Sequence, residues 1–180
     1  MRLLASFSHI IDTFNKRIGI SVAWLALFMV LIQFSVVVLR YVFGYSSIFM
    51  QESIIYMHGF LFLLGAGYTL LHDGHVRVDI FYREATPRKK AMTDIFGVFA
   101  FLIPVCICFL VYSWPYVSNS WSILESSKET SGIPGVFVLK SAIILFCGLI
   151  ILQGLSMVIH SIRIITGDEQ PAPEEEHEGI

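Results

Sequence analysis

The residue types that could act chemically in this sequence stand mainly at the ends of its apolar runs. Arg40 and Glu52 bracket the segment RYVFGYSSIFMQE, and Tyr41 directly follows the arginine. A connection of this length can bring the ends of two helices together. The two charged side chains could therefore form a salt bridge, contact a partner or be solvated. Each of these roles is structural rather than catalytic.

A second group of polar residues lies in the stretch LLHDGHVRVDIFYREATPRKK. His75, Arg77 and Asp79 alternate with apolar residues, a pattern typical of an extended segment with one polar face. His72 and Asp73 add further metal-ligand types, but the spacing fits no zinc pattern. We therefore expect a packed turn whose basic residues contact lipid, rather than a metal site.

Histidines on facing helices could also hold a haem through two axial imidazoles. His58 lies near the start of the second apolar run, whereas His160 follows the end of the fourth. These positions fall on opposite sides of the membrane, so the two histidines cannot bind one iron. His72 and His160 could approach each other at the same end. The alternative function is therefore the membrane anchor of an electron-transfer or quinone-linked complex.

The composition indicates an integral membrane protein. Of the 180 residues, 56% are hydrophobic and 14% charged, and the mean hydropathy is +0.73. Soluble chains carry about a quarter charged residues. The nucleophile, phosphate-loop and metalloprotease motifs are absent, so we expect no enzyme. The basic residues are too scattered for a nucleic-acid surface, and three cysteines inside apolar runs indicate no disulfide framework.

Four apolar runs without Asp, Glu, Lys or Arg predict an all-α fold of four transmembrane helices. They cover about residues 18–39, 53–71, 95–117 and 141–159. At 1.5 Å per residue, each run can cross a hydrocarbon core of about 30 Å. Because no ionisable group lies near the midplane, we expect a scaffold rather than a transport pathway. Polar side chains within the runs, such as Gln153, are expected to form hydrogen bonds between helices.

The two ends of the chain differ in character from the 18–165 membrane domain. Residues 1–17 place apolar residues on one face, which predicts a short amphipathic helix on the membrane surface. Residues 166–180 are acidic and contain two prolines, which predicts a disordered cytoplasmic tail. Nine of the 12 Lys and Arg residues fall on the side of the N-terminus, so both termini are predicted to be cytoplasmic.

Several of these features recur together in a known family. The run from RYVFG through QESIIYMHGFLFLLGAGYTL to HVRVDIFY and PRKK resembles the Q-type small membrane subunit of tripartite ATP-independent periplasmic (TRAP) transporters. The shared pattern is carried here by Arg40 with Tyr41, Glu52, Gly65 with Gly67, and His75 with Asp79. The stretch ESSKETSGIP, which contains Glu129, and the pair Gln153–Gly154 extend the resemblance to about residues 18–165.

The resemblance implies a four-helix scaffold that assembles with a large membrane subunit and a periplasmic substrate-binding protein. The complex would be a sodium-coupled symporter of organic acids in the bacterial inner membrane, with its sodium sites in the large subunit. This chain would then bind no cofactor and contact membrane lipids but no nucleic acid. The candidates for structural or partner contacts are Arg40, Tyr41, Glu52, His75, Arg77, Asp79, Glu129 and Gln153.

Overall fold

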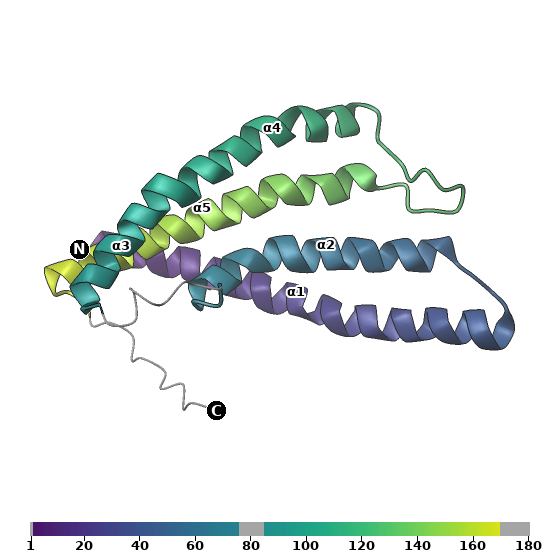
Figure 1. The fold of residues 1–180 in the computed structure, drawn as a ribbon, viewed down its shortest axis with the longest axis horizontal. Helices are drawn as coiled ribbons and strands as arrows, with labels where there is room; N and C mark the ends of the chain where they lie inside the picture. The colour runs from purple at the N-terminus through teal and green to yellow at the C-terminus, as the bar shows by residue number, and fades with distance from the viewer. Residues whose placement is uncertain (1, 76–84, 170–180) are drawn as a thin grey trace.

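The computed structural model describes residues 2–75 and 85–169, and every regular element in these ranges is a helix. The elements are α1 (Arg2–Phe43), α2 (Ile48–Leu71), α3 (Pro87–Gly97), the π-helical turn η1 (Val98–Leu102), α4 (Ile103–Ser122) and α5 (Val136–Thr166). Helices α1 and α2 form one antiparallel hairpin, and α4 and α5 form another beside it (Figure 1).

Four stretches are long and apolar enough to cross a membrane, which confirms the prediction of an all-α fold with four such helices. They are Leu3–Phe43, Ile48–Leu71, Pro87–Ser122 and Val136–Thr166. The helices extend beyond the apolar runs because charged residues continue a helix outside hydrocarbon as readily as apolar ones do. The third stretch, for example, begins at Pro87, whose missing N–H is tolerated in the first helical turn.

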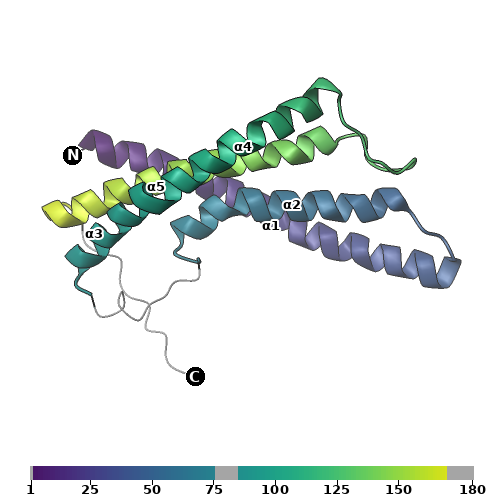
Figure 2. The same ribbon diagram turned by 45° about the horizontal axis from the view of Figure 1, so that its top comes forward.

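The two ends of the bundle have different contents. The start of α1, the end of α5 and helix α3 lie together at one end, which we call the terminal end (Figure 1 and Figure 2). The connections 44–47 and 123–135 lie at the opposite, or loop, end. Gly44, with a φ of +67°, turns the chain out of α1, and the Ser47 hydroxyl caps α2 by accepting from the Met50 N–H at 3.4 Å.

Helix α1 differs from its prediction because it is one continuous helix over residues that we expected to form a separate surface helix and a span. Ser8, Ile11 and Asn15 are buried, whereas the apolar residues Phe7 and Ile10 are exposed. The polar face of the N-terminal segment therefore packs into the bundle, and its apolar face points outward. Its location at the membrane surface stays a prediction.

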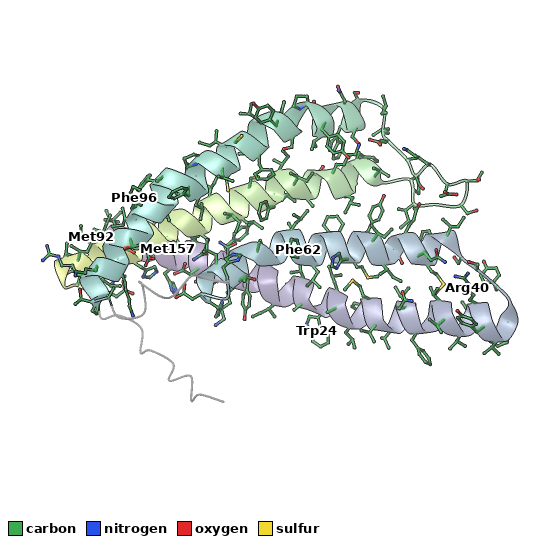
Figure 3. All side chains as sticks on the ribbon, viewed as in Figure 1. Trp24, Arg40, Phe62, Met92, Phe96 and Met157 are labelled. Atoms are coloured by element: carbon green, nitrogen blue, oxygen red, sulfur yellow. The ribbon has the colours of Figure 1, made fainter. Side chains whose placement is uncertain are left out.

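Helix α5 is the centre of the fold, since it packs against α1, α2, α3 and α4. Glycines allow close approach between helices at two levels. A Cβ on Gly19 would lie 2.3 Å from the Tyr68 side chain, and one on Gly154 would lie 3.0 Å from Leu102. By contrast, Trp24 of α1 and Phe96 of α3 point away from the bundle (Figure 3).

Candidate structural site: polar clusters at the two ends of the bundle

Asp12 is the centre of a polar cluster at the terminal end. Its Oδ1 accepts hydrogen bonds from Gln153 Nε2 at 2.9 Å and from the Ser156 hydroxyl at 2.6 Å. Its Oδ2 lies 2.9 Å from His160 Nε2. One carboxylate of α1 thus joins three side chains that follow one face of α5. We define the terminal cluster as Ser8, Asp12, Asn15, Gln153, Ser156, His160, Arg163 and Glu169.

Gln153 uses both ends of its amide within this cluster. Its Nε2 donates to Asp12, and its Oε1 accepts from Asn15 Nδ2 at 2.9 Å. Gln153 and Asn15 are both buried. Because the two α1 residues lie one helical turn apart, the Gln153 amide fixes the axial position of α1 against α5. Interhelical hydrogen bonds of this kind contribute about 1 kcal/mol each in membrane proteins.

His160 and Glu169 close the other side of the cluster. Gly167 ends α5 in the left-handed conformation, with a φ of +80°, and thereby turns the chain back toward the helix. Glu169 Oε1 then lies 2.9 Å from His160 Nδ1, and Glu169 Oε2 lies 2.9 Å from an Arg163 guanidinium nitrogen. The first residues after α5 are therefore tied to the same imidazole as α1.

The ring contacts of His72 and His160 differ from those of a pair of haem ligands. Both ring nitrogens of His160 face carboxylates, which leaves neither free for iron. His72 Nδ1 lies 3.0 Å from the Tyr68 carbonyl, and its ring packs on the Tyr68 ring. In the ranges 2–75 and 85–169, no three His, Cys, Asp or Glu residues are placed to hold a metal.

Glu52 is the centre of a second cluster, at the loop end. Its Oε2 accepts from the Ile133 N–H at 2.6 Å, and its Oε1 accepts from the Ser127 hydroxyl. Gly132 allows this approach because a Cβ there would lie 2.2 Å from Ser127 Oγ and 2.6 Å from Glu52 Oε1. Glu52 thus fastens the 123–135 connection to the start of α2. We define the loop cluster as Glu52, Tyr116, Trp121, Glu125, Ser127, Ile133, Lys140 and Ser141.

The salt bridge between Arg40 and Glu52 that the sequence left open is not formed in the described part of the chain. Most of the segment between them is helical, because α1 continues to Phe43 and α2 begins at Ile48. The helices fix the direction of each side chain, and Glu52 is occupied by the 123–135 connection. Arg40 lies exposed near the α1–α2 turn (Figure 3). The next residue, Tyr41, is also exposed.

The remaining members of the loop cluster join the end of α4 to the start of α5. Lys140 pairs with Glu125, and its ammonium lies 3.8 Å from the centre of the Tyr116 ring. The hydrogen bond from Lys140 lowers the pKa of Glu125 below its usual value. Trp121 Nε1 donates to the Ser141 hydroxyl at 2.7 Å. This hairpin is therefore held by charge, ring and hydroxyl contacts together.

The other sequence candidates are placed more simply. Glu129 is exposed in the 123–135 connection, where its N–H donates to Ser127 Oγ at 3.1 Å. His75 is exposed at the end of the first described range. Arg77 and Asp79 lie outside the described residues, as does the expected acidic tail from residue 170 onward.

The sequence analysis missed the α1 half of the terminal cluster. Ser8, Asp12, Asn15 and Gly19 follow one another at steps of four, three and four residues, which places them on one helical face. This stripe of small and polar residues is the signal that could have found the contact with α5. It was overlooked because the apolar residues of the same segment predict a surface helix.

The four apolar stretches, with α5 at their centre and polar clusters near both ends, define a polytopic membrane protein of the helical-bundle class. The family model for tripartite ATP-independent periplasmic transporters, DctQ component, matches residues 29–164. The chain belongs to this family, and is thus a small component of a TRAP transporter, as the resemblance predicted. Comparisons with curated proteins and with solved structures each give no match.

Proposed function

We propose that this chain is the small permease subunit of a sodium-coupled, binding-protein-dependent transporter of organic acids, and that it acts as a scaffold for the large membrane subunit. Membership of a transporter-component family supports a role in transport rather than in enzymatic chemistry. The observation that carries the scaffold role is the use of polar side chains within the chain itself. Gln153 and Ser156, for example, both bond Asp12 and so are not free to form a substrate path.

The outer surface of the bundle supports assembly with another membrane protein. Exposed large apolar side chains extend along α1, η1 and α4, among them Trp24, Leu31, Phe34, Phe101 and Val111. A surface of this kind suits hydrocarbon or the apolar face of a partner helix. In a family of tripartite transporters, we expect the large subunit to cover part of it and membrane lipids the rest.

The proposed location is the bacterial inner membrane with both termini cytoplasmic. The loop end would then face the periplasm, where a soluble binding protein could reach the 123–135 connection. We expect the substrate and sodium sites to lie in the other two components, and we expect no cofactor in this chain. The proposed substrate class, organic acids, rests on the family resemblance alone.

Reconstitution tests this proposal directly. Proteoliposomes would be prepared with the large subunit alone, with this chain alone, and with both, each with the binding protein and a radiolabelled carboxylate. We expect uptake only with both membrane subunits and an inward sodium gradient, with potassium in place of sodium as the control. Uptake by this chain alone, or unchanged uptake without it, would contradict the scaffold role. A haem absorption band in the purified complex would favour an electron-transfer anchor instead.

A further inference from the structure

One imidazole in the terminal cluster lies between two carboxylates. His160 Nε2 is 2.9 Å from Asp12 Oδ2, and His160 Nδ1 is 2.9 Å from Glu169 Oε1. An ionised carboxylate can only accept hydrogen bonds, and a neutral imidazole carries a single N–H. Both contacts are hydrogen bonds only when each ring nitrogen carries a proton. The geometry is therefore that of an imidazolium ion.

The charges around the ring lead to the same conclusion. Asp12 of α1 and Glu169 after α5 bring two negative charges, and Arg163 balances one of them through Glu169. A protonated His160 balances the other. Each of these side chains is only about a fifth to a third exposed, so an unbalanced charge costs more here than on an open surface. The charged residues of α3, which also packs on α5, are Arg88, Lys89, Lys90 and Asp94.

The arrangement does not suit a metal ion. A metal-binding histidine gives one nitrogen to the metal and the other to a supporting acceptor. Here Asp12 and Glu169 lie on opposite nitrogens of His160, so the two carboxylates do not converge on one point. The ligand that satisfies both sides of the ring is a proton.

We propose that His160 is a proton-binding site that fastens both terminal segments of the chain to the bundle, α1 through Asp12 and the residues after α5 through Glu169. When the ring releases its proton to water, one carboxylate loses its donor. Asp12 keeps Gln153 and Ser156, and Glu169 keeps Arg163, so the cluster loosens without separating. The double contact is present at acidic pH and is lost as the pH rises through the titration of the ring.

This site goes beyond the proposed function. Asp12 and Glu169 both lie outside residues 29–164, the part matched by the family model, so family membership does not supply the site. The site also needs no transport activity to be measured, because the protonation of one ring can be observed directly. A failure of the transport proposal and a failure of this one are therefore distinguishable.

The first test is a pH titration of the full chain, purified with the large subunit and carrying histidines labelled with nitrogen-15. His160→Gln identifies the His160 signal by its loss, and a blocked histidine peptide in water serves as the reference ring. We expect both His160 nitrogens to be protonated at about pH 7, and to stay so to higher pH than those of the peptide. A His160 that is neutral at about pH 7 and titrates together with the peptide would overturn the proposal.

The second test keeps His160 in place and changes its neighbour. Glu169→Gln removes one flanking charge, and Asp168→Asn removes the adjacent, exposed acid as the matched control. We expect Glu169→Gln to lower the pH at which the ring titrates by about one unit, a tenfold loss of proton affinity, and Asp168→Asn to change it far less. Equal shifts in the two variants would show that the Glu169 contact does not hold the proton.

Discussion

At the terminal end of the bundle, Asp12 bonds residues that stand 141 to 148 positions later in the chain, whereas at the loop end Glu52 bonds residues 75 and 81 positions later. The first cluster joins the first helix to the last. The second joins α2 to the connection between α4 and α5. The two helical hairpins are therefore fastened at both ends by polar contacts, and the apolar middle is left to packing.

The two clusters also differ in what provides the donors. Asp12 bonds side chains, including a titratable ring, while Glu52 bonds a hydroxyl and a backbone N–H. Backbone and hydroxyl donors keep their protons at every physiological pH, but an imidazole does not. We therefore expect the loop end to be insensitive to pH near neutrality and the terminal end to respond to it.

The largest expected effect is that of Asp12→Ala. The substitution removes the acceptor of three α5 side chains; the buried Gln153 Nε2 loses its acceptor, and the Ser156 hydroxyl keeps only the Ser8 carbonyl at 3.4 Å. Unsatisfied buried groups of this kind cost about 1–3 kcal/mol each, so we expect a loss of about 3 kcal/mol of unfolding free energy. Unfolding in mixed detergent micelles measures it, with exposed Lys16→Ala as the control. Equal losses would show that the terminal cluster does not hold the bundle.

The next effect concerns packing between the two clusters. Gly19→Ala would place a Cβ 2.3 Å from Tyr68, and we expect a cost of about 1–3 kcal/mol from overpacking. Gly148→Ala is the matched control, because a Cβ there meets nothing within 4 Å. The same unfolding measurement compares them. If both alanines are tolerated equally, α1 and α2 do not need the close approach at Gly19.

Glu52→Ala tests the loop end. Without its carboxylate, the Ser127 hydroxyl and the Ile133 N–H lose their acceptor, so we expect the 123–135 connection to open more often. Limited proteolysis of this connection should become several-fold faster. Arg40→Ala should leave the rate unchanged, because Arg40 forms no ion pair with Glu52 among the described residues. Similar acceleration by both variants would indicate that Arg40 and Glu52 act as a pair.

The smallest effect is expected for Glu125→Gln. Lys140 lowers the pKa of Glu125, so the stabilisation from this contact is complete above the ordinary carboxyl pKa and is lost as the pH falls through the lowered value. The amide oxygen that Glu125→Gln introduces can still accept a hydrogen bond from Lys140, so the variant should stay close to the natural chain near pH 7. Proteolysis of the 123–135 connection should accelerate on acidification in the natural chain and less in the variant. Identical acid dependence in the two proteins would show that the contact between Lys140 and Glu125 does not stabilise the 123–135 connection.

The membrane-crossing stretches could be predicted because hydrocarbon excludes unpaired charge. Each stretch is therefore visible in the sequence as a run without charged residues. The ends of the helices could not, since a helix continues past the membrane without any change in backbone hydrogen bonding. Helix α1 (Arg2–Phe43) shows this most clearly. The predicted boundary near residue 18 is the point at which charged residues end, but the helix is continuous across that point.

The polar contacts were predictable only in part. Gln153 stands out in the sequence because a polar residue in an apolar run needs a partner. Asp12 does not stand out, because a carboxylate in a charged N-terminal segment has the composition of a solvated residue. Arg40 and Glu52 invited pairing through their nearness in sequence, whereas the folded chain gives Glu52 a partner from a distant connection. Only the tertiary arrangement decides between such partners.

The π-helical turn η1 has a consequence for the phase of the third membrane-crossing stretch. Val98 and Leu102 both lie beside Gly154, and Cys106 follows in the core with Cys147. An α-helix turns about 100° per residue, so two successive steps of four residues would rotate this stripe by about 80° away from α5. The wider π turn absorbs part of that rotation. Deleting one residue from Val98–Leu102 would leave seven α-helical steps between Val98 and Cys106, about 700° in total, so we expect a regular α-helix that still directs Cys106 to within about 20° of the α5 face.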